Sequence, residues 1–111
     1  MGVPWEITPD KVQAVIQKII EVGRPRKLIV FGSYVRGTTH RDSDIDFLVV
    51  TGDDIDNPRK ESVRIMQALR GLHILADIIV VPESLLRELA DTPGLIYREA
   101  LKTGRVIYEA A

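Results

Sequence analysis

A polar segment punctuated by glycines, residues 32–43, separates two apolar runs and limits how those runs can be arranged. The runs, residues 28–31 and 45–50, have the length and composition of buried strands. Gly32-Ser33 follows the first run directly, and Asp44 stands at the start of the second. For these residues to line one cleft, the two strands should be antiparallel. The sequence therefore disfavours a doubly wound parallel sheet, in which ligands gather at the carboxyl ends of the strands.

Helix-capping residues predict a helix before the first strand. Thr8 as N-cap and Pro9 at the first helical position begin it, and Gly23 ends it. Its apolar residues recur at the spacing of one helical face, at Val12, Val15, Ile16, Ile19 and Ile20.

A second predicted helix begins at Asn57-Pro58 and ends at Gly71, with Val63, Met66 and Leu69 expected to face the core. The elements expected after it are a strand at 74–81, a helix at 84–90, a helix at 92–103 and an edge strand at 106–108. This order predicts an α/β (α+β) fold, in which a small mixed β-sheet is flanked by helices. A chain of 111 residues is expected to form one domain, residues 1–111.

Composition excludes several classes of function. The formal net charge of −1 leaves no overall basic field to hold nucleic acid. A small basic group, Arg24, Arg26 and Lys27, is either a solvated loop or a phosphate contact. Cysteine is absent, which excludes zinc–thiolate sites and thiol catalysis. No apolar run approaches the ~20 residues of a membrane span, and a cytoplasmic location is expected.

Asp44 and Asp46 are the most informative pair of side chains. Residues i and i+2 of a strand point to the same face, with Cα atoms about 6.5–7 Å apart. Two like charges at that spacing repel each other, and a bound cation removes the repulsion. Carboxylate oxygens, without cysteine or clustered histidine, favour Mg²⁺ or Mn²⁺ over zinc.

Asp77 supplies a third carboxylate, because it interrupts an otherwise apolar run, residues 74–81. A charged side chain inside such a strand is seldom present unless it is paired, bound to a ligand or on a solvated face. Gly32-Ser33 can bring backbone N–H groups and a hydroxyl to an anion, and Arg36 lies one turn later. A Gly-Ser pair alone is most often only a turn. Its spacing from the aspartates makes it informative.

Gly32-Ser33, ten further residues and then Asp44-Ile45-Asp46 resemble the Gly-Ser-x10-Asp-x-Asp motif of the DNA polymerase β-like nucleotidyltransferases, in particular the minimal nucleotidyltransferases. The resemblance covers essentially the whole chain. It implies that Gly32 and Ser33 hold the triphosphate of ATP or another nucleoside triphosphate. It also implies that the metal-binding and catalytic carboxylates are Asp44, Asp46 and Asp77, around two Mg²⁺ ions.

The same resemblance implies a partner. Minimal nucleotidyltransferases often resemble the antitoxin of a pair whose toxin is a helical HEPN-family ribonuclease, so AMP transfer to a hydroxyl on such a toxin is expected. Three alternatives stay open: an antitoxin that only occludes its toxin, a small-molecule or RNA acceptor, and a homo-oligomer that completes the cleft. Apolar residues beyond core needs are expected as a contact surface at Leu85, Leu86, Leu89, Leu95 and Ile96.

Overall fold

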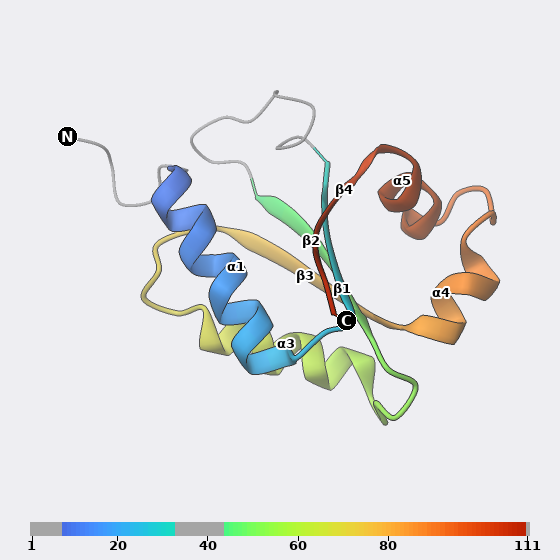
Figure 1. Cartoon of the computed structure of the whole chain (residues 1–111), viewed down its shortest axis with the longest axis horizontal. Coiled ribbons are helices and arrows are strands. Elements are labelled where there is room, and N and C mark those ends of the chain that lie inside the picture. Colours follow the sequence, from blue (N-terminus) through green and yellow to red (C-terminus); the bar gives the residue numbers. More distant parts are fainter. Residues whose placement is uncertain (1–7, 33–43, 111) are drawn as a thin grey trace.

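The computed structural model describes residues 8–32 and 44–110, which form one four-stranded sheet with helices on both faces (Figure 1). The strand order is β3-β2-β1-β4, with β1 antiparallel to β2 and β4, and β2 parallel to β3. The mixed sheet and the antiparallel first pair are therefore as predicted. The strands are β1 (Lys27–Phe31), β2 (Ile45–Thr51), β3 (Ala76–Pro82) and β4 (Arg105–Glu109). The helices are α1 (Pro9–Gly23), α3 (Pro58–Ala68), α4 (Glu83–Leu89) and α5 (Ile96–Thr103).

The α1 helix begins and ends where its capping residues predict. The hydroxyl of Thr8 accepts a hydrogen bond from the backbone N–H of Lys11 at 3.3 Å. At the other end, Arg24 is left-handed, with φ of 45°, and its N–H donates to the carbonyl of Ile20. The residues that α1 buries against the sheet are Val12, Val15 and Ile19.

The α3 helix begins after its predicted cap, Asn57, but faces the core differently from the prediction. Val63 and Met66 are 48% and 44% exposed, so their expected burial is wrong. Leu69 is buried as expected, and Ile65 is buried in place of the other two. Ile65 and Leu69 are four residues apart and therefore lie on one face of the helix. Residues 63, 66 and 69 are spaced by three, and because a helical turn takes 3.6 residues, each of them lies further around the helix than the one before. The apolar pair 63 and 66 therefore lies on the outer face.

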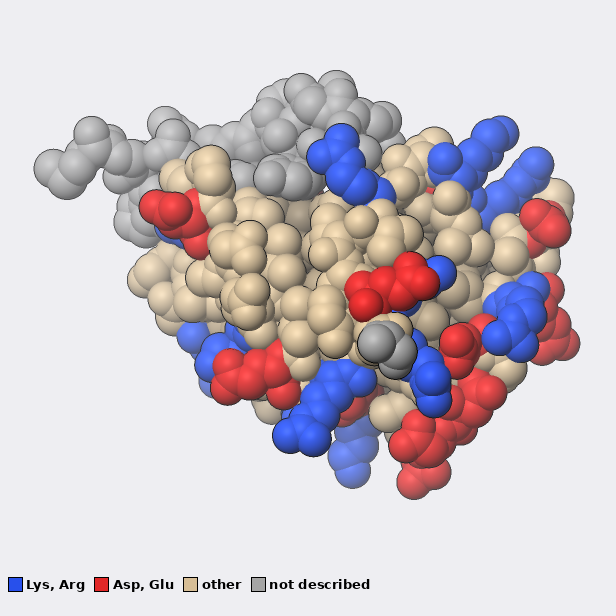
Figure 2. Space-filling view, in the orientation of Figure 1, with Lys and Arg blue, Asp and Glu red and all other residues tan. Residues whose placement is uncertain are grey.

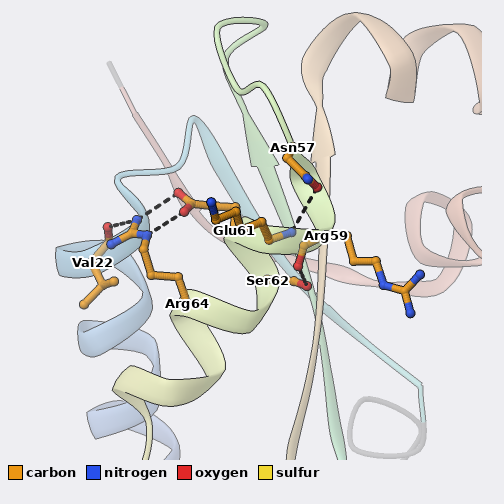
Figure 3. A network of polar contacts seen from close by, with 7 residues as sticks. Val22, Asn57, Arg59, Glu61, Ser62 and Arg64 are labelled. Atoms are coloured by element: carbon orange, nitrogen blue, oxygen red, sulfur yellow. Dashed lines mark hydrogen bonds and ion pairs between the residues drawn. The ribbon is translucent and has the colours of Figure 1, made fainter.

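A polar clamp ties α3 to the end of α1 (Figure 3). Arg64 Nη2 donates to the carbonyl oxygen of Val22 at 2.8 Å, and the same guanidinium forms a two-pronged ion pair with Glu61. The hydrogen bond from Arg64 lowers the pKa of the Glu61 carboxyl. A cation at a helix C-terminus is also favoured by the helix dipole. The clamp therefore links α3 to the last turn of α1 on this face.

Successive side chains of each strand point to opposite faces of the sheet, so the core is divided into two clusters, one on each face. Ile45, Phe47 and Val49 of β2 pack toward α1 and α3, whereas Leu48 and Val50 pack in the cluster that contains α4 and α5 side chains. Even-numbered positions of β2 consequently face α4 and α5.

The later elements follow the predicted order with shifted boundaries. The third strand begins at Ala76 rather than 74, and α5 begins at Ile96 rather than 92, after Gly94 with φ of +84°. Gly104 ends α5 as expected. No helix within the described residues is long and apolar enough to cross a membrane.

Candidate active site

Asp46 and Asp77 lie side by side in the sheet. The parallel register of β2 and β3 pairs the two residues directly, so their side chains leave the same face of the sheet. Neighbouring strands are about 4.7–4.9 Å apart, which places the two carboxylates within reach of a shared cation. The pair stands at the N-terminal ends of both strands, on the face that α4 and α5 cover further along.

Gly32 supports the carboxylate of Asp46. Phe31, the last residue of β1, pairs with Asp46, and Gly32 follows with φ of +81°. A Cβ atom on Gly32 would overlap Asp46 Oδ2, so the carboxylate lies directly against the glycine backbone. The sequence predicted a close approach of Gly32 to phosphate but gave no sign of this contact with Asp46.

Asp44 directly precedes β2, at the position expected from the sequence, and is exposed. The chain is held there because the backbone N–H of Ile45 donates to the carbonyl of Leu75 at 2.9 Å, next to the start of β3. The three aspartates thus come from two adjacent strand ends, close to where β1 finishes.

Asp77 is exposed, which changes the argument for its role. It lies on β3, an edge strand, so its charge needs no ligand to compensate for burial. Among the described residues, no lysine or arginine makes an ion pair with it. The reason to place Asp77 in the site is therefore its register opposite Asp46, rather than its position within an apolar run.

Two of the predicted site residues, Ser33 and Arg36, lie outside the described residues. Within residues 8–32 and 44–110, no group of three or more acidic or histidine side chains is arranged to hold a metal ion. A three-carboxylate metal site at Asp44, Asp46 and Asp77 thus stays a prediction. The donors that the fold brings together are oxygen atoms of the kind that Mg²⁺ and Mn²⁺ prefer.

Charge is mixed on the molecular surface seen in Figure 2. Lysine and arginine side chains are interspersed with aspartate and glutamate over the described residues of this face. A face of this kind differs from the single-sign basic surfaces that bind nucleic-acid backbones.

Comparisons with known proteins agree with the motif. Residues 13–111 match the model of the family described as "Polymerase beta, Nucleotidyltransferase". A Methanocaldococcus jannaschii protein named "Putative protein adenylyltransferase" is 34% identical over 86 residues, which cover 78% of this chain and 81% of that protein.

Similar solved structures include a toxin–antitoxin complex crystallised with AMP-PNP, at 28% identity and a TM-score of 0.55, covering 85% of this chain and 73% of that one. Two others show likeness of fold alone. A structure from Sulfolobus solfataricus described as a "putative nucleotidyltransferase" has 19% identity and a TM-score of 0.54, covering 93% of this chain and 90% of that one. A mutant MntA–HpeT toxin–antitoxin structure has 20% identity and a TM-score of 0.56, covering 94% and 75%.

Proposed function

Because the chain belongs to the polymerase beta nucleotidyltransferase family, we propose that it transfers AMP from ATP to a hydroxyl group on a partner protein, with Mg²⁺ as the metal. The observation that carries the proposal is the Asp46–Asp77 pair, held in register beside Gly32 at one end of the sheet. Nucleotidyl transfer itself follows from the family. The nucleotide, the metal and the acceptor are the proposed parts.

Asp44, Asp46 and Asp77 would hold two Mg²⁺ ions, and Mn²⁺ would also suit their oxygen atoms. When bound, such ions supply Lewis-acid activation of the acceptor oxygen and charge neutralisation of the departing pyrophosphate. Gly32, Ser33 and Arg36 would hold the triphosphate through backbone N–H groups, a hydroxyl and a guanidinium.

The transfer forms a bond between the acceptor oxygen and the α-phosphorus and breaks the bond from that phosphorus to the β-phosphate oxygen, releasing pyrophosphate. The hydroxyl proton passes to a carboxylate, for which Asp77 is the candidate because it is exposed at the edge of the sheet. The chain's own contribution is to orient the triphosphate in line with the acceptor.

A protein acceptor is supported by the exposure of two of the three aspartates. Asp44 and Asp77 are both exposed, so a protruding side chain can reach them without entering a deep pocket. The similar M. jannaschii protein is named "Putative protein adenylyltransferase", and a similar solved structure is of a toxin–antitoxin complex with AMP-PNP. We therefore propose a HEPN-type toxin as the partner and an antitoxin role for this chain.

The expected contact surface on α4 and α5 is present in part. Leu85, Leu95 and Ile96 are 38–39% exposed, whereas Leu86 is core and Leu89 is half-buried. The three exposed side chains support docking of a second protein on this side of the sheet.

Co-expression with the protein encoded beside it, followed by intact-mass analysis of both chains, tests the proposal. AMP increments on the partner are expected with the native chain and absent with Asp44→Ala/Asp46→Ala. A matched control, Asp54→Ala/Asp56→Ala, removes the same charge from two exposed loop aspartates beyond the other end of β2 and should leave transfer unchanged. A stable complex without modification would favour an occluding antitoxin. Absence of any complex would contradict the pairing and leave a second copy, a small molecule or RNA as the alternatives.

A further inference from the structure

A cavity of about 380 Å³ lies between the α4–α5 layer and the sheet, away from the aspartates. Its apolar wall is formed by Val50, Leu86 and Leu101, from β2, α4 and α5. Its basic side chains are Arg26, Lys27 and Arg87. A volume of this size is within the range of small-molecule sites, which are typically apolar with a few polar groups that orient the ligand.

The strand register separates this cavity from the acidic pair. Lys27 lines the cavity at the start of β1, and Phe31, at the other end of the same strand, pairs with Asp46. Four residues of extended chain span about 13 Å. Figure 1 shows β1 running from its start beside the C-terminal end of the chain to its far end, where the trace turns grey. The cavity is therefore a second location rather than an extension of the nucleotide site.

Of the basic side chains that line the cavity, only Arg26 forms an ion pair with a described carboxylate. Arg26 pairs with Glu83 at 3.4 Å, although both side chains are largely exposed. Lys27 stands opposite Glu109 in the β1–β4 register, and both line the cavity. No described carboxylate makes an ion pair within 4 Å of Lys27.

Arg87 likewise has no close acidic partner among residues 8–32 and 44–110. It contributes only a longer-range attraction to Asp53, whose pKa is lowered chiefly by a hydrogen bond from the backbone of Ser84. No ion pair within 4 Å joins Arg87 to a carboxylate of the described chain. Two cations, Lys27 and Arg87, therefore have no ion-pair partner among the described residues and line a partly apolar cavity, to which Glu83 and Glu109 also contribute.

The backbone at the rim is fixed by hydrogen bonds on both sides. The N–H of Arg26 donates to the carbonyl of Val50, and the N–H of Ala110 donates to the carbonyl of Arg26, both at 2.8 Å. These bonds hold the ends of β1, β2 and β4 together, so the wall of the cavity that the sheet forms is preformed. A preformed site avoids part of the ordering cost of binding.

We propose that this cavity is a second binding site, which takes a small organic carboxylate with an apolar body. The apolar body would lie against Val50, Leu86 and Leu101, and the carboxylate would accept hydrogen bonds from Lys27 and Arg87. Charge-assisted hydrogen bonds of this kind are stronger than neutral ones, and the apolar wall excludes water from one side. None of these residues belongs to the proposed transfer site, so a test of this second site does not depend on whether the proposed transfer occurs.

The test uses the full chain and two probes with the same body and opposite charge, 4-phenylbutyrate and 4-phenylbutylamine. Amide ¹H–¹⁵N spectra are recorded while each probe is added. The carboxylate is expected to shift signals around Val50, Leu86 and Leu101 saturably, with a Kd of about 1 mM or tighter. The amine is expected to leave those signals in place.

Lys27→Gln and Arg87→Gln remove one cation each and are each expected to weaken carboxylate binding by roughly tenfold. Lys102→Gln is the matched control, because Lys102 is an exposed cation on α5 that does not line the cavity. Circular dichroism establishes that each variant is folded. The proposal is overturned by unsaturable or scattered shifts, by equal binding of the amine, by full affinity in both cavity variants, or by an equal loss in Lys102→Gln.

Discussion

Replacing Gly32 with alanine should damage the acidic site more than it damages the fold. The backbone of Gly32 has φ of +81°, a conformation that costs an alanine about 1–2 kcal/mol. The new methyl group would also overlap Asp46 Oδ2. This atom is the far end of a side chain, so the carboxylate can move away at little further cost in stability. Its displacement would remove the geometry that the proposed transfer requires.

Gly71→Ala separates the two effects. Gly71 has φ of +90°, and an added Cβ there would meet no atom within 4 Å. Both variants should lose about 1–2 kcal/mol of unfolding free energy in urea. Only Gly32→Ala should lose AMP transfer, by roughly 100-fold, since a misplacement near 1 Å has that effect.

Calorimetry provides a second readout on the chain alone, in which Mg²⁺·ATP should bind more weakly to Gly32→Ala than to Gly71→Ala. If the two variants bind and transfer equally well, the contact between Gly32 and Asp46 does not position the carboxylate, and the reasoning is refuted.

Three further variants test separate features of the chain. Ser33→Ala should weaken Mg²⁺·ATP binding by more than the ~1 kcal/mol that a capping hydroxyl contributes to folding, and unchanged affinity in calorimetry would contradict a phosphate contact. Arg64→Ala should lower stability in urea by about 1 kcal/mol, because it removes the hydrogen bond to the Val22 carbonyl and an exposed ion pair; an unchanged midpoint would exclude the clamp. The pKa of Asp53 is lowered by its hydrogen bond from the Ser84 backbone, so its stabilising effect is present above the unfolded pKa and is lost as pH falls through the folded one. Asp53→Asn should therefore flatten the fall in stability under acid, and a curve parallel to that of the native chain would refute this role.

Elements with local signals could be predicted from the sequence. Thr8 and Asn57 cap helices where expected, and Gly104 ends one, because a cap depends on residues within a single turn. The outward turn of Val63 and Met66 could not be predicted, since the position of α3 depends on its contacts with α1 and β3. A helical stripe identifies an apolar face but not the face that a neighbour will cover.

The candidate site likewise has one part that the sequence predicts locally and another that depends on how distant segments pack. The spacing of Asp44 and Asp46 from Gly32 is local and was sufficient to identify the motif. The pairing of Asp46 with Asp77 depends on the register between strands separated by a helix, which the sequence does not specify locally. The cavity near Lys27 was missed for the same reason, because its lining comes from several segments that are distant in the sequence.

We propose that the paired carboxylates of Asp46 and Asp77 carry AMP transfer. The most direct test of this proposal is intact-mass analysis of the purified partner after incubation with ATP, Mg²⁺ and either the native chain or Asp46→Asn/Asp77→Asn. Asparagine keeps the side-chain shape and removes both charges, and Asp54→Asn/Asp56→Asn supplies the matched control. AMP increments are expected with the native and control chains and none with the site variant. Equal increments with the site variant would contradict it.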